Sequence, residues 1–422
     1  MMSQFFPVDE RVEQAAQNAL AAAQKQFDRI DAIRTHNQEK VLAAFIKNGV
    51  TESHFAESTG YGYGDRGREV LDRVLADAVD APDALIRHSL TCGTHTLCVA
   101  LFGVLRPGDT MLCVTGTPYD TIHSVIGLRG SGMGSLKDFG VNYRQTALGA
   151  DGRPDLDAIE KELTERKLAM VYIQRSRGYS LRPSLGVEKI EQIARLVHEK
   201  SDAVLMVDNC YGEFVQETEP VSHGADLIAG SLIKNPGGAI AKCGGYLAGR
   251  SDLIEKCAYR MTTPGLGREV GPSLGQNRGL FMGLFNAPHI VGEALKTAVF
   301  AAALFREFGF EATPAFDEKR CDIIQALKLR TSENLIAFCQ GMQKGAPIDS
   351  TVVPEPWDMP GYDSQVIMSA GAFTGGSSIE LSSDAPLREP FAVWMQGSMN
   401  FDSGKIGVLL AAQEMIKRGL IS

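Results

Sequence analysis

The sequence predicts an α/β protein built on a mostly parallel sheet with helices on both faces. Between about residues 85 and 250, short apolar strands alternate with helical segments. The strands lack polar alternation, which is typical of strands that are buried on both faces. Because parallel strands need crossover connections, this alternation favours a parallel sheet sandwiched by helices. After about residue 290 the pattern is mixed, and we expect a smaller α+β domain there.

The expected elements follow in chain order. An Ala-rich, charged region predicts a helix over 8–47, and the Gly-rich stretch 58–69 predicts a loop before a helix at 68–79. In the central region we expect helices at 97–105, 119–128, 154–166 and 185–199, and strands at 110–115, 168–174, 203–208, 226–231 and 244–249. Farther on we expect helices at 288–309 and 321–329 and a strand at 376–384. The expected domains are therefore an N-terminal helical segment (1–57), a large α/β domain (58–290) and a small C-terminal domain (291–422).

The composition is that of an ordinary globular protein. Hydrophobic residues make up 44% and charged residues 22% of the chain, and the net charge is −9. No basic cluster suggests nucleic acid or anionic lipid as a partner. We see no signal peptide and no apolar run of about 18 residues, so we expect a cytoplasmic protein. The eight cysteines are scattered, which favours free thiols in a reducing compartment over a metal site.

Two charged residues follow buried strands and indicate a reactive site. Asp208 ends the apolar run "VLMVD", and Lys234 follows a second apolar strand in "GSLIKNPGG". Taken alone, Asp208 is also compatible with a cap of the next helix. Ligands of parallel sheets bind at the carboxyl ends of the strands, so an aspartate and a lysine there are expected to act together.

Pyridoxal 5′-phosphate (PLP) chemistry needs both of these groups. The lysine amine forms a Schiff base with the aldehyde, while the aspartate keeps the pyridine nitrogen protonated so that the ring accepts electrons. We expect burial to lower the pKa of Lys234, which suits a nucleophilic amine.

The remaining parts of the cofactor also have candidate partners. Gly93, Thr94 and His95 precede an apolar helix, whose free N–H groups suit a phosphate. Ser231, three residues before the lysine, offers a hydroxyl. Tyr119 is a candidate to stack on the pyridine ring, and His95 is a second candidate for that place. The alternatives are an ordinary helix start for the glycine turn and a packed core histidine for His95.

This set of residues resembles the fold type I PLP-dependent enzymes, and most closely their cystathionine and methionine lyase branch. The strings "GYGYGDRGRE", "QRSRGYS", "SLIKNPGG", "KCGGYLAG" and "REPFAVWMQGSMNFDSGKIGV" resemble the methionine γ-lyase-like "aluminium resistance" family, which is also described as cystathionine β-lyase. The resemblance covers nearly the whole chain. It implies the aspartate aminotransferase-like fold, with a mostly parallel seven-stranded sheet, and PLP as the cofactor.

The resemblance implies roles for further residues. In the lyase branch a Tyr-x-Arg segment reaches the phosphate of the partner subunit; here Tyr61 matches the tyrosine, whereas Tyr63 stands in the arginine place and Arg66 or Arg68 is left to compensate. The branch uses a C-terminal arginine for the substrate carboxylate, and Arg388 is the best match. Ser176 and Arg177, which follow a buried strand in "YIQRSRGYS", are assigned to the cofactor and to the substrate carboxylate, respectively.

The implied function is a PLP-dependent carbon–sulfur lyase acting on a sulfur-containing amino acid. Lys234 is expected to move the α-proton, and Tyr61 or Tyr119 to assist departure of the thiol. Transamination, γ-replacement and racemisation remain alternatives, because one fold supports all of these reactions. A non-catalytic role in metal stress is a further alternative. The resemblance also implies a homodimer or homotetramer with shared active sites.

Overall fold

The computed structural model describes residues 4–359 and 364–421. The chain forms two compact units, one of residues 36–287 and one of residues 1–35 together with 288–422. These units differ from the three expected segments, because the long helix α1 (Glu10–Lys47) contributes to both of them. Helix α8 (Asn277–Glu307) also contributes to both units; it begins well before residue 288, where the sequence pattern places its start.

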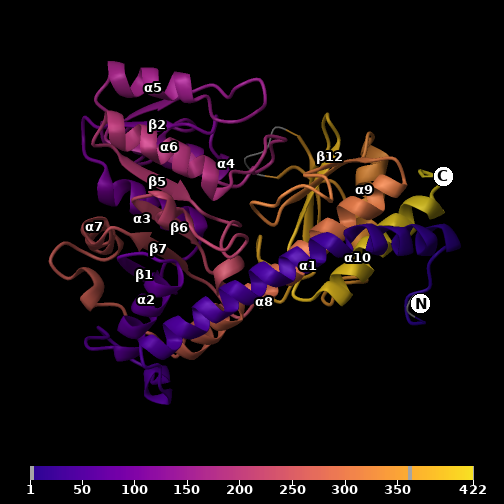
Figure 1. The fold of residues 1–422 in the computed structure, drawn as a ribbon, viewed down its shortest axis with the longest axis horizontal. Helices are drawn as coiled ribbons and strands as arrows, with labels where there is room; N and C mark the ends of the chain where they lie inside the picture. The colour runs from indigo at the N-terminus through magenta and orange to yellow at the C-terminus, as the bar shows by residue number, and fades with distance from the viewer. Residues whose placement is uncertain (1–3, 360–363, 422) are drawn as a thin grey trace. The chain divides into compact units, whose positions relative to one another are not determined.

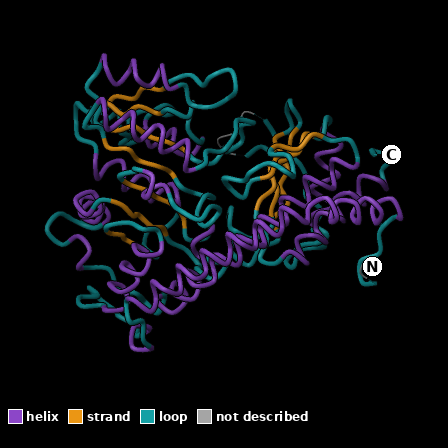
Figure 2. The backbone as a smooth tube through the Cα atoms, viewed as in Figure 1, coloured by secondary structure: helices purple, strands orange, loops and turns teal. Residues whose placement is uncertain are grey.

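The unit of residues 36–287 contains the expected α/β sheet (Figure 2). Its helices include α2 (Arg66–Ala78), α3 (Gly93–Val104), α4 (Asp120–Ile126), α5 (Leu156–Glu165), α6 (Val187–Lys200) and α7 (Ser251–Met261). Its strands are β1 (Asp83–Arg87), β2 (Thr110–Cys113), β3 (Asn142–Gln145), β4 (Met170–Gln174), β5 (Val204–Asp208), β6 (Leu227–Ser231) and β7 (Gly245–Gly249).

The seven strands lie in the order β1-β7-β6-β5-β4-β2-β3. Strands β2 to β6 run parallel to their neighbours within that group, whereas β7 is antiparallel to both β1 and β6. The mostly parallel sheet predicted from the sequence is therefore confirmed. The sequence pattern did not assign β1 or β3.

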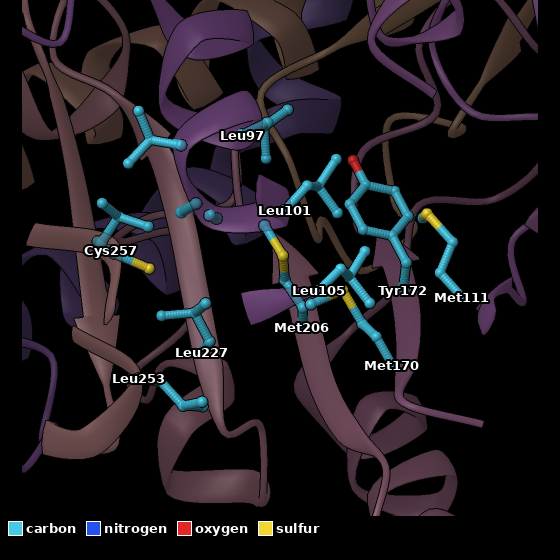
Figure 3. Packing of buried hydrophobic residues seen from close by; sticks show 14 of the residues in the cluster. Leu97, Leu101, Leu105, Met111, Met170, Tyr172, Met206, Leu227, Leu253 and Cys257 are labelled. Atoms are coloured by element: carbon cyan, nitrogen blue, oxygen red, sulfur yellow. The ribbon is translucent and has the colours of Figure 1, made fainter. Parts of the chain in front are cut away.

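Side chains are buried on both faces of this sheet. On one face, Leu97, Leu101 and Leu105 from and after α3 pack with strand residues such as Tyr172 and Met206 (Figure 3). Strand residues alternate between the faces, and those on the opposite face, including Val171, Ile173, Leu205 and Val207, are fully buried as well. Helices α5 and α6 pack against each other and run along the sheet (Figure 1). Covered on both faces, the sheet leaves its strand ends as the place for polar chemistry.

The other unit contains a smaller antiparallel sheet. Its strands β8 (Glu311–Thr313), β9 (Gln325–Lys328), β10 (Val366–Ala370), β11 (Ser382–Pro386) and β12 (Ala392–Gln396) lie in the order β10-β11-β12-β9-β8. Helices α9 (Ser332–Gln343) and α10 (Phe401–Lys417) pack against each other. The α+β prediction is confirmed for this part of the chain.

Two sequence predictions in this unit need correction. The helix expected at 321–329 is wrong, because this segment forms β9, which pairs with β12 on one side and β8 on the other. Its apolar run is too short for periodicity to separate a strand from a buried helix. The strand expected at 376–384 begins only at Ser382.

Within the described residues, α8 alone is long and apolar enough to meet a length-and-hydropathy test for a membrane span. In its most apolar window, 83% of the residues are buried inside the protein, as in the core helix of a globular unit.

Candidate active site

Lys234 lies in a tight turn that follows β6. It precedes the short helical turn η3 (Asn235–Gly237) and is half-buried, as its position after an apolar run predicts. Only glycine fits at position 237, because a Cβ there would lie 1.6 Å from the carbonyl oxygen of Leu232. The lysine Nζ lies 3.9 Å from the centre of the Tyr211 ring. The turn and the aromatic ring together set the direction of the lysine side chain.

Asp208 ends β5, the strand next to β6, and is buried. Its Oδ1 accepts a hydrogen bond from the backbone N–H of Cys210 at 3.1 Å. The hydroxyl of Tyr172 lies 3.5 Å from Oδ2. No α-helix follows Asp208 directly, and the next helical segment described is the short η2 (Pro220–His223). The structure therefore does not support a helix-capping role for this aspartate.

The two groups interact electrostatically. Burial raises the pKa of the Asp208 carboxyl, and the positive charge of Lys234 offsets only part of that rise. Burial acts to lower the pKa of Lys234, but electrostatic interactions with Cys210, Tyr211 and Asp208 outweigh it, and the pKa is raised. The expectation that burial would lower the pKa of Lys234 is therefore wrong, because the sequence does not show how many ionisable neighbours the fold brings to the amine.

The start of α3 lies beside the end of β6. Gly93, the first residue of α3, approaches Ser231 so closely that a Cβ on the glycine would lie 3.3 Å from the serine Cβ. The Oγ of Ser231 is buried and has no hydrogen-bond partner among the described residues. A buried, unpaired hydroxyl next to a helix N-terminus is suited to an anion such as phosphate.

Two other residues predicted around α3, Thr94 and His95, have hydrogen-bonding contacts within the protein. Thr94 Oγ1 lies 2.8 Å from Thr121 Oγ1, which links α3 to α4. The Nδ1 atom of His95 accepts a hydrogen bond from the backbone N–H of Thr91 at 3.1 Å. Tyr119 immediately precedes α4, and its negative charge when ionised contributes to the raised pKa of Lys234, although less than that of Cys210 does. The phenol of Tyr119 thus lies within electrostatic range of the lysine.

Ser176 and Arg177 follow β4, the other neighbour of β5, and both are buried. The carbonyl oxygen of Ser176 accepts a hydrogen bond from Gln174 Nε2 at 3.0 Å. The Nε of Arg177 lies 3.5 Å from the hydroxyl of Ser184. Both residues are placed at the strand-end edge that carries Asp208, and their roles toward cofactor and substrate remain predictions.

Tyr61 and Tyr63 lie on an exposed loop, with their rings stacked at 5.6 Å between centroids. Arg68 cannot serve the phosphate role that the sequence left open to it. Its guanidinium is buried and donates to the carbonyl oxygens of Gly62, Gly271 and Glu269. Arg66 is exposed and keeps that role as a prediction.

Arg388 belongs to the other compact unit. It lies in the turn between β11 and β12, where its side chain is exposed and its carbonyl oxygen accepts from the N–H of Phe391 at 2.8 Å. Its role toward a substrate carboxylate stays a prediction.

The sequence did not single out two residues that the structure places close to the candidate site. Tyr211, whose ring contacts the lysine, adopts a left-handed φ of 70°, which is unusual for a tyrosine. Glu213 is buried, with 1% of its surface exposed, and interacts electrostatically with Lys234. Tyr211 could have been found from the sequence, because it is an aromatic residue three positions after the strand-end Asp208. No local sequence pattern indicates Glu213.

The residues present fit PLP. Ser231 and the α3 N-terminus supply an unpaired hydroxyl and N–H groups for a phosphate. Asp208 is a buried carboxyl whose burial cost a protonated ring nitrogen would offset. Lys234 supplies the amine on the adjacent strand.

An aspartate and a lysine on adjacent strand ends of a seven-stranded α/β sheet define a class, the fold type I PLP-dependent enzymes. This chain has that fold. The family follows from comparison with known proteins: the methionine gamma-lyase family model matches residues 12–416, and the chain belongs to that family.

Close relatives cover nearly the whole chain. A carbon-sulfur lyase involved in aluminum resistance from Clostridium novyi NT is 51% identical, with a TM-score of 0.94 over 97% of this chain and 96% of its own. The Bacillus subtilis (strain 168) protein named "Uncharacterized protein YnbB" is 46% identical over 394 residues, which is 93% of each chain. The PLP-dependent protein YhfS from Escherichia coli is 16% identical with a TM-score of 0.64, over 92% of this chain and 97% of its own, and shows the fold alone.

Proposed function

We propose that this protein is a PLP-dependent carbon–sulfur lyase that acts on a sulfur-containing amino acid. The observation that carries the proposal is the electrostatic interaction of Asp208 and Lys234 at adjacent strand ends, together with the buried, unpaired hydroxyl of Ser231. A solved relative described as a carbon-sulfur lyase supports the reaction class. The reaction consumes the amino acid and water and releases a thiol, a keto acid and ammonia.

PLP, when bound, withdraws electrons from the α-carbon of the substrate and so makes the α-proton acidic. Ser231 and the N–H groups at the start of α3 would hold the phosphate. The Asp208 carboxylate would hold the proton of the ring nitrogen. The Nζ of Lys234 takes the proton from the α-carbon and returns it later, which is the work of a general base and acid. The hydroxyl of Tyr119 or Tyr61 donates a proton to the departing sulfur.

We further propose that Arg177 or Arg388 binds the substrate carboxylate, because a guanidinium forms two parallel hydrogen bonds to that group. Tyr61 and Tyr63 are exposed in the single chain. We propose that they complete the site of a partner subunit in a homodimer or a higher oligomer.

The experiment combines a spectrum with product analysis. Purified protein supplied with PLP is expected to show a visible absorbance band from covalent attachment, and Lys234→Ala is expected to lose it. With cystathionine and with methionine as separate substrates, thiol, keto acid and ammonia are measured in parallel. Equal release of the three products supports the lyase, whereas transfer of the amino group to an added keto acid supports an aminotransferase instead. Wild-type protein that takes up no PLP would overturn the proposal.

A further inference from the structure

A cluster of buried polar side chains comes from the segments after β4 and β5 and from β7, close to the candidate site. It consists of Arg175, Asn209, Glu213, Glu219 and Tyr246, and each of these residues exposes 1% or less of its surface. We call this set the buried polar cluster. Burying so many polar groups is costly unless they bond to one another, so the cluster needs a structural or functional reason.

Asn209 is the centre of the buried polar cluster. Its Oδ1 accepts a hydrogen bond from Arg175 Nη1 at 2.7 Å. Its Nδ2 donates to Glu219 Oε2 at 3.0 Å and to the Tyr246 oxygen at 3.1 Å. Arg175 and Glu219 also form an ion pair at 3.4 Å, so their charges compensate each other. The Tyr246 hydroxyl then donates to Glu213 Oε1 at 2.8 Å.

The cluster is connected to the segment that follows Asp208 and to the segment that follows Lys234. Asn209 directly follows Asp208 in the chain, and Asn235 directly follows Lys234. The Nδ2 of Asn235 donates to the carbonyl oxygen of Glu213 at 2.9 Å. Glu213 is therefore connected through Tyr246 to the segment after Asp208, and through its own carbonyl group to the segment after Lys234.

The carboxyl of Glu213, unlike that of Glu219, has no positively charged partner at ion-pair distance among the described residues. Its Oε2 is buried and has no hydrogen-bond partner among the described residues, and no ion pair of Glu213 is found there. A Cβ at Gly230 would lie 2.4 Å from Oε1, so β6 leaves no room for a further side chain against this carboxyl.

The charged and titratable groups that face Glu213 are Glu219, Tyr246, Lys234 and Cys210. Burial and, to a smaller extent, the charge of Glu219 raise the pKa of Glu213 to about 8, although the hydrogen bonds from its own backbone and from Tyr246 and the charge of Lys234 act to lower it. At neutral pH most of the protein therefore carries Glu213 as a carboxylic acid, which avoids a second buried anion beside Glu219.

We propose that Glu213 is a positioning residue which, as a neutral carboxylic acid, ties the segment after Asp208 to the segment after Lys234 and so fixes the spacing of these two side chains. The inference rests on the proposed function, because that spacing matters only if one ring is held between the two groups. Ionisation of Glu213 would place a second buried anion beside Glu219 and so loosen the arrangement.

The test is a titration of the full-length apoprotein with PLP, followed by visible absorbance at pH 7 and pH 9. Glu213→Gln keeps the shape and an oxygen for Tyr246 but cannot ionise, so its affinity at pH 7 is expected to stay within about threefold of wild type. Glu213→Ala and Tyr246→Phe each break the connection and are expected to weaken binding by about tenfold, the effect of one lost hydrogen bond. From pH 7 to pH 9, wild type is expected to lose affinity relative to Glu213→Gln.

Tyr143→Phe is the matched control, since it removes a tyrosine hydroxyl from β3 of the same sheet whose partner is the exposed Gln145. It is expected to bind PLP as wild type does. The positioning role is overturned if Tyr246→Phe binds PLP like the control. This variant decides the question even if Glu213→Ala does not fold and cannot be measured. The neutral state is overturned if Glu213→Gln is as weak as Tyr246→Phe at pH 7.

A second measurement needs no cofactor. The pKa of Glu213 is raised from 4.5 in the unfolded chain to about 8 in the folded one, so the folded state binds more protons between these values. Stability is then lost as the pH rises through that window. The denaturant midpoint of wild-type apoprotein is expected to fall relative to that of Glu213→Gln between pH 5 and pH 8, and parallel curves would overturn the neutral carboxylic acid. If wild type binds no PLP, the proposed function fails, and the positioning role fails with it. The pH dependence of the denaturant midpoint still tests whether Glu213 is a neutral carboxylic acid.

Discussion

The ammonium nitrogen of Lys234 lies 3.9 Å from the centre of the Tyr211 ring. A cation over an aromatic face is stabilised by about 0.5–2 kcal/mol. We therefore expect Tyr211→Leu to lower the pKa of Lys234 by about 0.4–1.4 units, because each unit corresponds to about 1.4 kcal/mol. The free amine then forms at lower pH, so the pH profile for the reaction rate with PLP shifts in the acidic direction.

Tyr211→Phe is the control for this prediction. It keeps the aromatic face but loses the hydroxyl, whose ionised form also raises the pKa of the lysine. We expect a smaller acidic shift than in Tyr211→Leu. Equal profiles for wild type and Tyr211→Leu would show that the ring contact has no influence on the amine.

The Ser231 hydroxyl leads to a prediction with opposite effects on binding and stability. Because the buried Oγ has no partner among the described residues, Ser231→Ala is expected to leave the apoprotein equally stable or slightly more stable. If the hydroxyl holds a phosphate, the same change weakens PLP binding by about tenfold, the effect of one charge-assisted hydrogen bond. Chemical denaturation and PLP titration of the same preparation measure both effects.

Ser135→Ala is a suitable control, since the Ser135 hydroxyl is buried and accepts a hydrogen bond from the N–H of Asp138. Its removal is expected to destabilise the protein by about 1 kcal/mol and to leave PLP affinity unchanged. A Ser231→Ala protein that behaves in the same way would rule out the phosphate role of Ser231.

The sequence was sufficient to predict a mostly parallel sheet and to place Asp208 and Lys234 at its strand ends. Short apolar runs located β5 and β6, and the residues at or just after their ends, Asp208 and Lys234, are where a parallel sheet places its ligands. Strand β3 was not assigned because it is a polar edge strand that is only half-buried, so it lacks an apolar signal.

Properties that depend on distant neighbours were not predictable. The carboxyl of Glu213 contacts Tyr246 on β7, which is the second strand after β5 along the chain. No local sequence spacing connects the two residues. The direction of the Lys234 pKa shift depends on Cys210 and Tyr211, which the fold brings close after a reversal of the chain. The left-handed φ of Tyr211 likewise belongs to that reversal rather than to any sequence signal.

Gly212 allows the close approach of Arg175 in the buried polar cluster. A Cβ at this position would lie 2.5 Å from the arginine Cδ and 2.6 Å from Nη1. The guanidinium cannot move away without losing its bonds to Asn209 and to the Gly212 carbonyl. We expect Gly212→Ala to lower the free energy of unfolding by about 1–3 kcal/mol, measured by chemical denaturation.

Gly279→Ala is the matched control, because this glycine lies in α8 and a Cβ there would meet nothing within 4 Å. Alanine is the better helix former, so a gain of up to about 1 kcal/mol is expected. If both alanine variants stabilise the protein, the tight packing of Arg175 against Gly212 is not the constraint inferred here.

Arg68 holds the loop that carries the stacked pair Tyr61 and Tyr63. Its guanidinium donates to the carbonyl oxygen of Gly62, between the two tyrosines, and to that of Gly271. Arg68→Ala leaves the buried carbonyl group of Gly62 and the partly buried one of Gly271 without this donor, and we expect a loss of about 2–4 kcal/mol in the free energy of unfolding. Amide hydrogen exchange in residues 60–64 is expected to accelerate more than in the sheet, because the loop loses its main tether. The exposed Arg66→Ala serves as the control and should change neither quantity; uniform acceleration across the whole unit in Arg68→Ala would contradict a specific role in holding the loop.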